Sequence, residues 1–428
     1  MRRIICLMLV TLTLSGAGAV GPTPVTLNEA LTEAFNRHPN LRRLRTEVNV
    51  AGARVGEVRA LTGVQSGLSM SFRRQGPTVE FPTTPAGTVQ VVPDNFFSGS
   101  ITAQKLLFDG GRSSGERRAS ELGVELAREE LREAERQLTR EVKHAYYGLL
   151  KSERLMAVAE ETLKIAAEQL RVTQVKFAAG TIARFDVTRS EVEVSNAKQE
   201  LITAEKNVAL ARSTLNHQLS RPLEEAVTVV GPSTATEIAV TTSELVALAR
   251  QHRPELKLAE QRQRQARERT LVAQAARLPQ VSLQTSYTRQ TGTAFQENYN
   301  WFAGVGVTFD WFTSGRRKFA VRAAQLTSES ADATTARVRQ MIELEVTQVQ
   351  LSLREARQRI ETTAATVRSS LENLDIARLR YNNGVGINLE VMDAQLALSR
   401  AHTHNTNAVF DYWVALADLE AALGRSLP

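Results

Sequence analysis

Cysteine is almost absent from this chain, since the only one among its 428 residues is Cys6. That position lies in an apolar leader, so disulfide frameworks, cysteine-ligated zinc and thiol catalysis are excluded for the rest of the chain. Long apolar runs are missing as well. No segment beyond the leader reaches the roughly 18 uninterrupted apolar residues of a membrane-spanning helix. His402 and His404 are two positions apart and fall on different helix faces, so no metal site and no cofactor are expected.

The first 19 residues are typical of a secretory signal peptide. A pair of arginines is followed by an apolar run from Ile4 to Leu14 and by a small-residue cleavage site that ends at Ala19. The formal net charge is +7, but the basic residues alternate with glutamates along helical stretches. This pattern indicates solvated helix faces and argues against a nucleic-acid partner. An exported chain without a spanning helix is periplasmic, extracellular or an outer-membrane barrel.

The chain contains an internal repeat. Residues 108–112 (FDGGR) return as residues 312–316 (FTSGR), and residues 177–187 return as residues 381–391. The offsets are 312 − 108 = 204 and 381 − 177 = 204. A common offset without gaps over this distance indicates a tandem duplication, a feature to establish before any fold is assigned.

We therefore predict a signal peptide at residues 1–19, a first repeat at 20–230 and a second repeat at 231–428. Each repeat reads as a helix of about 35 residues with an early proline, two strands, a helix of about 60 residues, a glycine-containing break and a shorter returning helix. A helix of about 60 residues is a rod of roughly 90 Å. Its apolar residues recur with coiled-coil spacing.

The strands alternate apolar and polar residues, which predicts sheets with one apolar and one polar face. Trp301 and Trp311 are ten residues apart and are expected on one face of a single strand, at the two aromatic girdles of a membrane barrel. An ordinary β-sandwich with core tryptophans is the alternative. Four strands are too few to close a barrel, and open edges are unstable in hydrocarbon. The strands are therefore expected to close between chains. Three chains would give twelve strands and two would give eight, and a lumen for solutes favours three.

With the duplication, the paired Phe-x-x-Gly-Arg turns and the paired Phe/Tyr-x-x-Gly tips, the chain resembles the TolC-type outer-membrane efflux proteins. The resemblance implies an α+β membrane channel: long α-helical hairpins form an α-barrel, and four strands per chain join a transmembrane β-barrel closed between protomers. It also implies a homotrimer in the lipid of the cell outer membrane that extends into the periplasm. There the hairpin tips would dock a periplasmic adaptor and an inner-membrane pump.

A periplasmic gate is expected near the tips. Glu390 and Asp393 are spaced i, i+3 and share a helix face, so a trimer would repeat them as carboxylate rings that favour cations. Two solvated acids at a helix N-terminus are the alternative. By resemblance, Asp186 and Tyr381 match positions whose hydrogen bonds help to close the tunnel. Gly386 stands where the family carries a basic residue, so either Arg184 or Arg189 compensates, or the closed state is looser.

The resemblance also implies that an adaptor contacts the hairpin tips. The residues concerned are Phe177, Gly180, Val187, Gly384 and Val391. The two glycines permit positive φ at a tight turn, and this turn role alone is the simpler interpretation.

No catalytic residue is expected. Residues 111–115 fit the G-x-S-x-G pattern, but the matching residues of the second repeat contain no serine. The alternatives to a channel are a non-catalytic periplasmic adaptor and an exported coiled-coil structural protein. An adaptor would need small β-barrel or lipoyl-like domains around one hairpin. A coiled-coil protein would have no use for alternating strands.

Overall fold

The computed structural model describes residues 24–76, 80–84, 87–90, 94–231, 241–291 and 297–425. The predicted signal peptide lies outside these residues. The helices are α1 (Leu27–Arg37), α2 (Pro39–Leu61), α3 (Arg112–Ala178), α4 (Arg184–Leu219), α5 (Thr242–His252), α6 (Pro254–Ala275), α7 (Arg316–Asn382) and α8 (Asn388–Leu423). The strands are β1 (Val64–Arg74), β2 (Glu80–Thr84), β3 (Gly87–Gln90), β4 (Asn95–Phe108), β5 (Gln280–Gln290) and β6 (Tyr299–Thr308).

The duplication is visible in the backbone. All eight described residues with positive φ form four pairs separated by 204 positions: Gly110 and Ser314, Gly111 and Gly315, Gly180 and Gly384, Ser220 and Gly424. The first two pairs precede the long helices, the third lies at the hairpin tips and the fourth ends the returning helices. Both repeats therefore turn the chain in the same way at the same places.

The predicted opening helix of about 35 residues is wrong in both repeats, because each is two helices. The first breaks at His38 and the second at Arg253, whose backbones are extended with ψ of 121° and 122°. Pro39 and Pro254 then occupy the first turn of the next helix. Proline fits there because the first turn leaves its N–H groups unbonded, and it disfavours the helical conformation of the residue before it.

The chain forms two compact units, and each combines parts of both repeats. One unit contains Met1–Arg37, Glu141–Glu237 and Arg357–Val414, and the other contains His38–Arg140, Ile238–Ala356 and Ala415–Pro428. We call them the hairpin unit and the sheet unit. The boundary predicted at residue 230 therefore separates two sequence repeats and does not separate the two compact units.

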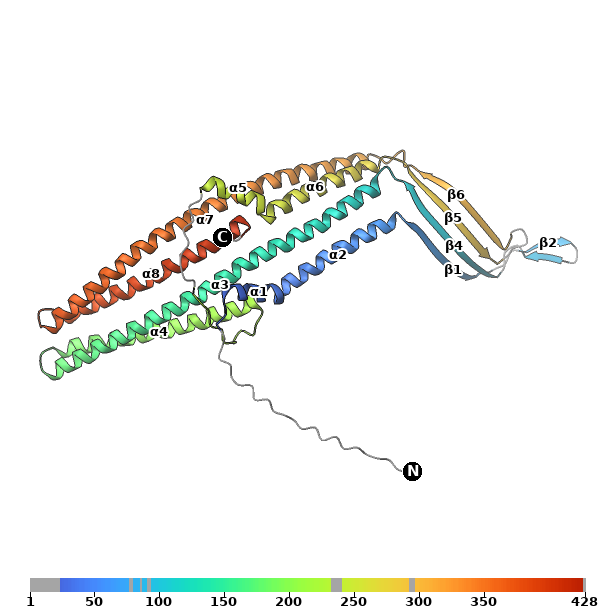
Figure 1. Cartoon of the computed structure of the whole chain (residues 1–428). Helices are drawn as coiled ribbons and strands as arrows, with labels where there is room; N and C mark the ends of the chain where they lie inside the picture. Colours follow the sequence, from blue (N-terminus) through green and yellow to red (C-terminus); the bar gives the residue numbers. More distant parts are fainter. Residues whose placement is uncertain are drawn as a thin grey trace, which may run out of the picture. The chain divides into compact units, whose positions relative to one another are not determined.

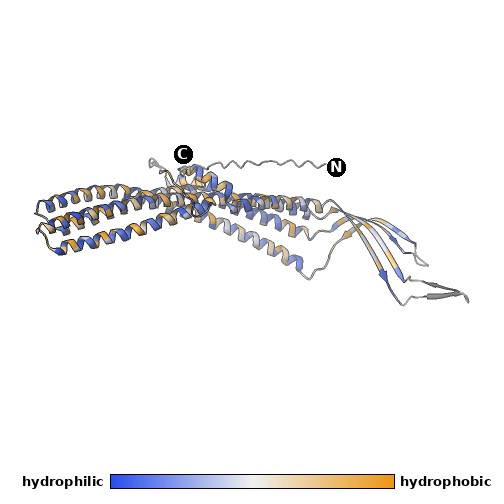
Figure 2. Cartoon of the chain, turned by 90° about the horizontal axis from the view of Figure 1, so that it is seen from below, coloured by the Kyte–Doolittle hydropathy of each residue, from blue (hydrophilic) through white to orange (hydrophobic). Residues whose placement is uncertain are grey.

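The hairpin unit contains the tip-side parts of two helical hairpins, α3 with α4 and α7 with α8 (Figure 1). Apolar and polar positions interleave along these helices (Figure 2). Ala145, Leu149 and Ala166 are buried, as their coiled-coil spacing predicts. Helix α1 is held to the end of α4 by Arg221, which bonds both carboxylate oxygens of Glu33. No helix among the described residues combines the length and apolarity that a membrane span requires.

The sheet unit contains an antiparallel four-stranded sheet in the order β1-β4-β5-β6 (Figure 1). Each repeat supplies one adjacent strand pair, and β4 with β5 joins the pairs. Within the described residues, β1 and β6 have a hydrogen-bonded neighbour on one side only. The sheet therefore ends in two open edges.

Both faces of the sheet are exposed, and they differ in chemistry. One row across the four strands is Leu68, Ile101, Tyr287 and Trp301, with 69, 57, 46 and 70% of each side chain exposed. The neighbouring row, on the opposite face, is Ser69, Ser100, Thr288 and Asn300. Since alternate residues point to opposite faces, one face is apolar and the other is polar without charge through the middle of the sheet.

The strand prediction is wrong in one detail. Strand β6 ends at Thr308, so Trp311 lies three residues beyond it, and the two tryptophans do not share one strand. The segment from Gln75 to Asp94, between β1 and β4, contains the β2–β3 hairpin, and its residues 77–79, 85–86 and 91–93 lie outside the described residues. The shorter loop after β5 includes residues 292–296, which also lie outside them.

Candidate functional site

The hairpin tips are built by two equivalent glycine turns. Gly180 has φ +73° and Gly384 has φ +74°, and each donates its N–H to the carbonyl three residues earlier. A Cβ at either position would meet no atom within 4 Å. The turn role predicted for these glycines is thus confirmed. Replacing them would introduce backbone strain at positive φ but no clash within the chain.

Three side chains of α3, spaced seven residues apart, bind the second hairpin of the same chain. The pairs are Thr162 with Ser399 at 3.0 Å, Gln169 with Asn388 at 2.7 Å, and Lys176 with Tyr381 at 2.6 Å. Seven residues are about two helical turns, so the three side chains lie on one face of α3. The tips are therefore held together by a polar ladder that ends at Lys176.

Lys176 makes two contacts with Tyr381. Its Nζ donates a hydrogen bond to the main-chain oxygen of Tyr381 and lies 3.6 Å from the centroid of the phenol ring. The ring belongs to a buried cluster with Leu374 and Val391, against which Val172 of α3 packs. Burial lowers the pKa of Lys176 from its ordinary value of 10.5. The contact thus combines a charge-assisted hydrogen bond with a cation–π interaction.

Asn388 joins three helices. This first residue of α8 is buried, and its Oδ1 accepts the bond from Gln169 of α3. Its Nδ2 lies 3.3 Å from Ser190 Oγ and 3.4 Å from the main-chain oxygen of Asp186, both on α4. A buried amide with all these partners fixes the geometry of the helices that it joins.

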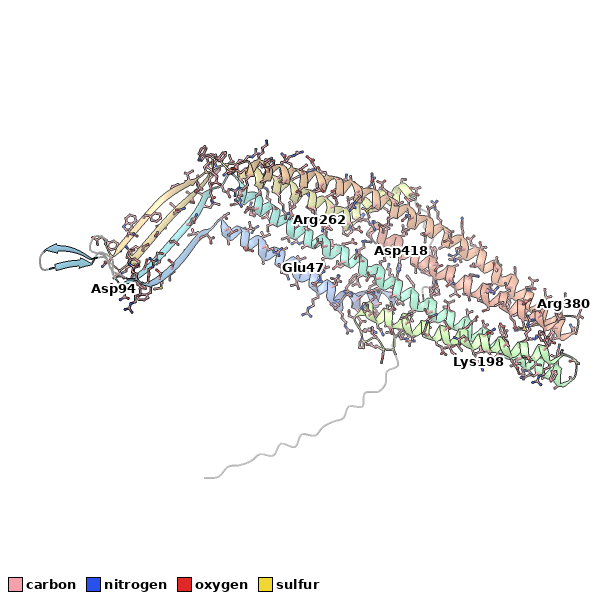
Figure 3. All side chains as sticks on the ribbon, turned by 180° about the vertical axis from the view of Figure 1, so that it is seen from behind. Glu47, Asp94, Lys198, Arg262, Arg380 and Asp418 are labelled. Atoms are coloured by element: carbon pink, nitrogen blue, oxygen red, sulfur yellow. The ribbon has the colours of Figure 1, made fainter. Side chains whose placement is uncertain are left out.

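The predicted gate residues are brought together only in part. Burial and the charge of Asp186 raise the pKa of Tyr381, but the Tyr381 hydroxyl has no hydrogen-bond partner in the part of the chain that the structure describes. Glu390 forms an exposed ion pair of 3.5 Å with Arg380, which lies at the tip in Figure 3. Asp393 is exposed on the same helix. The two carboxylates therefore do not have equivalent surroundings.

The predicted adaptor-contact residues also divide into two groups. Phe177, Gly180 and Gly384 are exposed, whereas Val187 and Val391 are buried among the helices. Of the predicted adaptor-contact residues, a partner can therefore touch only the phenylalanine and the two glycine turns, beside which Phe185 and Val385 are also exposed.

The structure explains why a glycine occupies position 386. A Cβ there would lie 3.0 Å from Glu390 Oε2 and 3.2 Å from the nitrogen of Tyr381, so a basic side chain has little room. Neither Arg184 nor Arg189 has a side-chain polar partner among the described residues of this single chain, so compensation by either residue in a trimer stays a prediction. Lys176 is a cation at the tip that contacts the second hairpin of the same chain.

Lys176, Gln169 and Asn388 were missed by the sequence analysis. The signal that would have found the first two is the seven-residue spacing of polar residues beside the apolar coiled-coil positions of α3. Asn388 carried no local signal, because its partners lie about 200 residues away in the sequence.

Between the two hairpins lies a cavity of about 450 Å³. Small and apolar side chains, including Ala166, Ala197 and Leu374, form part of its wall, and Glu161 and Arg154 are among its charged residues. Both hairpins thus contribute to one cavity with apolar and charged walls.

Outside the tips, Ser113 of the G-x-S-x-G pattern donates to the Asp109 carboxylate at the start of α3, which is a helix-capping contact.

The sequence matches a family profile described as "Outer membrane efflux protein" over residues 30–219 and 245–425. These two stretches correspond to the two repeats. The chain is 25% identical to the outer membrane efflux protein BepC of Brucella suis biovar 1 (strain 1330), over 96% of this chain and 88% of BepC.

Solved structures share the fold. The outer membrane protein VceC of Vibrio cholerae superposes with a TM-score of 0.81 at 20% identity, covering 94% of this chain and 97% of VceC. The open state of the MtrE outer membrane channel of Neisseria gonorrhoeae gives 0.79 at 21% identity, covering 94% and 89%.

Proposed function

The chain belongs to the outer membrane efflux protein family, and we propose that three copies of it close one continuous conduit that docks a periplasmic adaptor and an inner-membrane pump. The protein is an outer-membrane efflux channel of a tripartite system and extends into the periplasm. The predicted TolC-type resemblance is confirmed. The alternatives of an adaptor and of a coiled-coil structural protein are not supported, because the family match covers both repeats.

The open sheet with two exposed faces carries the proposal of a closed trimer. An apolar face in contact with water would be costly, at roughly 25 cal/mol per Å² of exposed apolar surface. Unpaired edge groups of β1 and β6 would each cost several kcal/mol in hydrocarbon. Pairing β6 of one copy with β1 of the next removes both problems if the apolar face meets lipid. The polar, uncharged face then lines a lumen of twelve strands.

Membrane fractions test this assembly. We expect the protein in the outer-membrane fraction as a trimer that survives detergent at room temperature and dissociates on heating. A soluble periplasmic monomer would contradict both the lipid contact and the trimer.

The second part of the proposal concerns the gate. In a closed trimer the tips of all three chains meet around the conduit, and the Lys176–Tyr381 contact holds the two hairpins of each chain together. The half-buried Asp186 can reach a neighbouring copy directly, whereas the Tyr381 hydroxyl is buried without a partner and would reach one only if the tip rearranges in the trimer. Glu390 and Asp393 would repeat as carboxylate rings that favour cations.

The third part concerns adaptor docking. Exposed Phe177 and the open space beside Gly180 and Gly384 allow an adaptor hairpin to approach the backbone closely. Replacing both glycines by leucine fills this space. We expect the double variant to lose chemical crosslinking to the adaptor while it retains trimers.

A matched control for added bulk is Gly56→Leu. Gly56 is exposed on α2 and also has no atom within 4 Å of a Cβ, but it lies in a regular helix. This variant should crosslink normally. Loss of trimers in the tip variant would instead assign the tip glycines a folding role.

A further inference from the structure

The end of the sheet at which the helices join carries cations without acidic partners. Lys105 lies on β4 near its end, Arg277 lies between α6 and β5, and Lys318 lies in the first turn of α7. All three are exposed, and none of their side chains has a hydrogen bond or ion pair among the described residues. The opposite end of the sheet is marked by Asp94 in Figure 3.

The nearby carboxylates are already occupied. Arg316 and Arg317 share the single carboxylate of Asp310, at 3.7 and 3.3 Å. Asp109 accepts bonds from the main chain of Gly111 and from Ser113. Positive charge at this end of the sheet is therefore in excess within each chain.

Aromatic side chains lie in the same segment. The residues that follow β6 and open α7 are strongly exposed: Phe309, Trp311, Phe312 and Phe319. The guanidinium of Arg317 lies 5.6 Å from the Phe309 ring centroid. Exposed aromatic rings beside cations are typical of the boundary between hydrocarbon and water in membrane proteins.

Lys105 connects this end with the apolar face. Its row across the sheet is Val64, Lys105, Leu283 and Val305. A lysine among apolar side chains can lay its aliphatic stem on the apolar surface and extend its ammonium group to the interface. The basic end and the apolar face are thus continuous.

We propose that Lys105, Arg277 and Lys318, with the aromatic residues after β6, form a collar that binds the phosphates of anionic phospholipids in the periplasmic leaflet of the outer membrane. The inference rests on the proposed insertion of the sheet in lipid and adds a headgroup preference to it. Two observations select this occupant. The excess cations complement anionic phosphates, and the apolar face beside them matches acyl chains. Each basic residue close to an anionic surface adds favourable electrostatic energy.

Trp311 is a natural probe of the collar. In a Trp301→Phe background the remaining tryptophans are Trp311 and Trp413, and Trp413 packs against the rings of Tyr147 and Tyr412 in the hairpin unit. The protein is reconstituted in phosphatidylcholine vesicles that contain increasing fractions of brominated phosphatidylglycerol or of brominated phosphatidylcholine. Quenching of tryptophan fluorescence then reports which lipid occupies the collar.

We expect brominated phosphatidylglycerol to quench at about fivefold lower fraction than brominated phosphatidylcholine. The variant Lys105→Gln, Arg277→Gln, Lys318→Gln should quench equally with both lipids. A charge-matched control changes three exposed cations elsewhere: Lys198→Gln, Lys206→Gln, Arg337→Gln. This control should keep the preference.

Equal quenching of the unmodified collar by both lipids would overturn the proposal. So would a preference that persists in the collar variant or disappears equally in the control. Quenching by neither lipid would refute insertion of the sheet itself, and with it the proposed function. Quenching by both lipids without preference would leave the channel intact and remove only the collar.

Discussion

Replacing Lys176 by methionine tests the link between the hairpins of each chain. Methionine keeps the length and apolar body of the side chain but loses the hydrogen bond to Tyr381 and the charge above its ring. A hydrogen bond from a charged group contributes about 1.5–3 kcal/mol and an exposed cation–π contact about 0.5–1 kcal/mol. Desolvation of the ammonium, which lowers the pKa of Lys176, offsets part of this gain.

If the Lys176–Tyr381 contact stabilises the closed state by a net of about 1.5 kcal/mol per chain, its loss in all three chains removes about 4.5 kcal/mol. This shifts the equilibrium constant between closed and open channels by more than about a thousandfold. We expect single Lys176→Met channels in planar bilayers to be open far more often than the unmodified protein. Lys176→Arg preserves the charge and should remain mostly closed.

The matched control is Lys164→Met. Lys164 lies on the same helix, but its side chain is 79% exposed and its nearest partner is Glu161 at 3.6 Å. It should behave like the unmodified channel. Unchanged conductance of Lys176→Met would refute a closing role for the contact.

Three further outcomes follow from the structure. The bonds from Arg221 lower the pKa of Glu33 below 4.5, so they stabilise the fold above that pH and are lost as the pH falls through the lowered value. Chemical denaturation should show Glu33→Gln less stable at neutral pH, with the difference disappearing in acid. Glu390→Ala with Asp393→Ala should raise anion conductance in bilayers, and unchanged selectivity would contradict the carboxylate rings. Asn388→Ala leaves buried partners unsatisfied and should lower the free energy of unfolding by about 1–3 kcal/mol, whereas an unchanged midpoint would exclude a structural role.

Features with a short-range signal were predicted correctly. The long helices were recognisable because glycine and proline are rare between the turns. The sheet faces followed from the alternation of apolar and polar residues along the strands, and the duplication followed from the constant offset of the turn and tip motifs. Each of these features can be recognised from neighbouring residues or by comparing the sequence with itself. None of them depends on knowing which distant residues come into contact in the fold.

Features that depend on distant partners were not predictable. Alternation continues past Thr308 through Phe309 and Trp311, yet β6 ends at Thr308 because that residue pairs with Gln280, the first residue of β5. An early proline is equally compatible with a long kinked helix and with a new helix. The extended backbone at His38 shows that Pro39 begins a new helix.

The candidate site shows the same limit. The family resemblance pointed to Asp186 and Tyr381, but not to Lys176, which contacts Tyr381 from another helix. That contact joins two segments about 200 residues apart in the sequence that lie side by side in the fold.

A disulfide between strand edges tests the central claim most directly. The mature chain that we predict has no cysteine, so Trp301→Cys on β6 can be combined in turn with Ser66→Cys, Leu68→Cys or Met70→Cys on β1. Within one chain these strands are separated by β4 and β5, at roughly 14 Å, beyond the reach of a disulfide. Closure between chains predicts that oxidation in membranes gives covalent trimers in at least one register and no larger species. Monomers in every register, or a ladder that continues beyond three, would contradict a barrel closed by three copies.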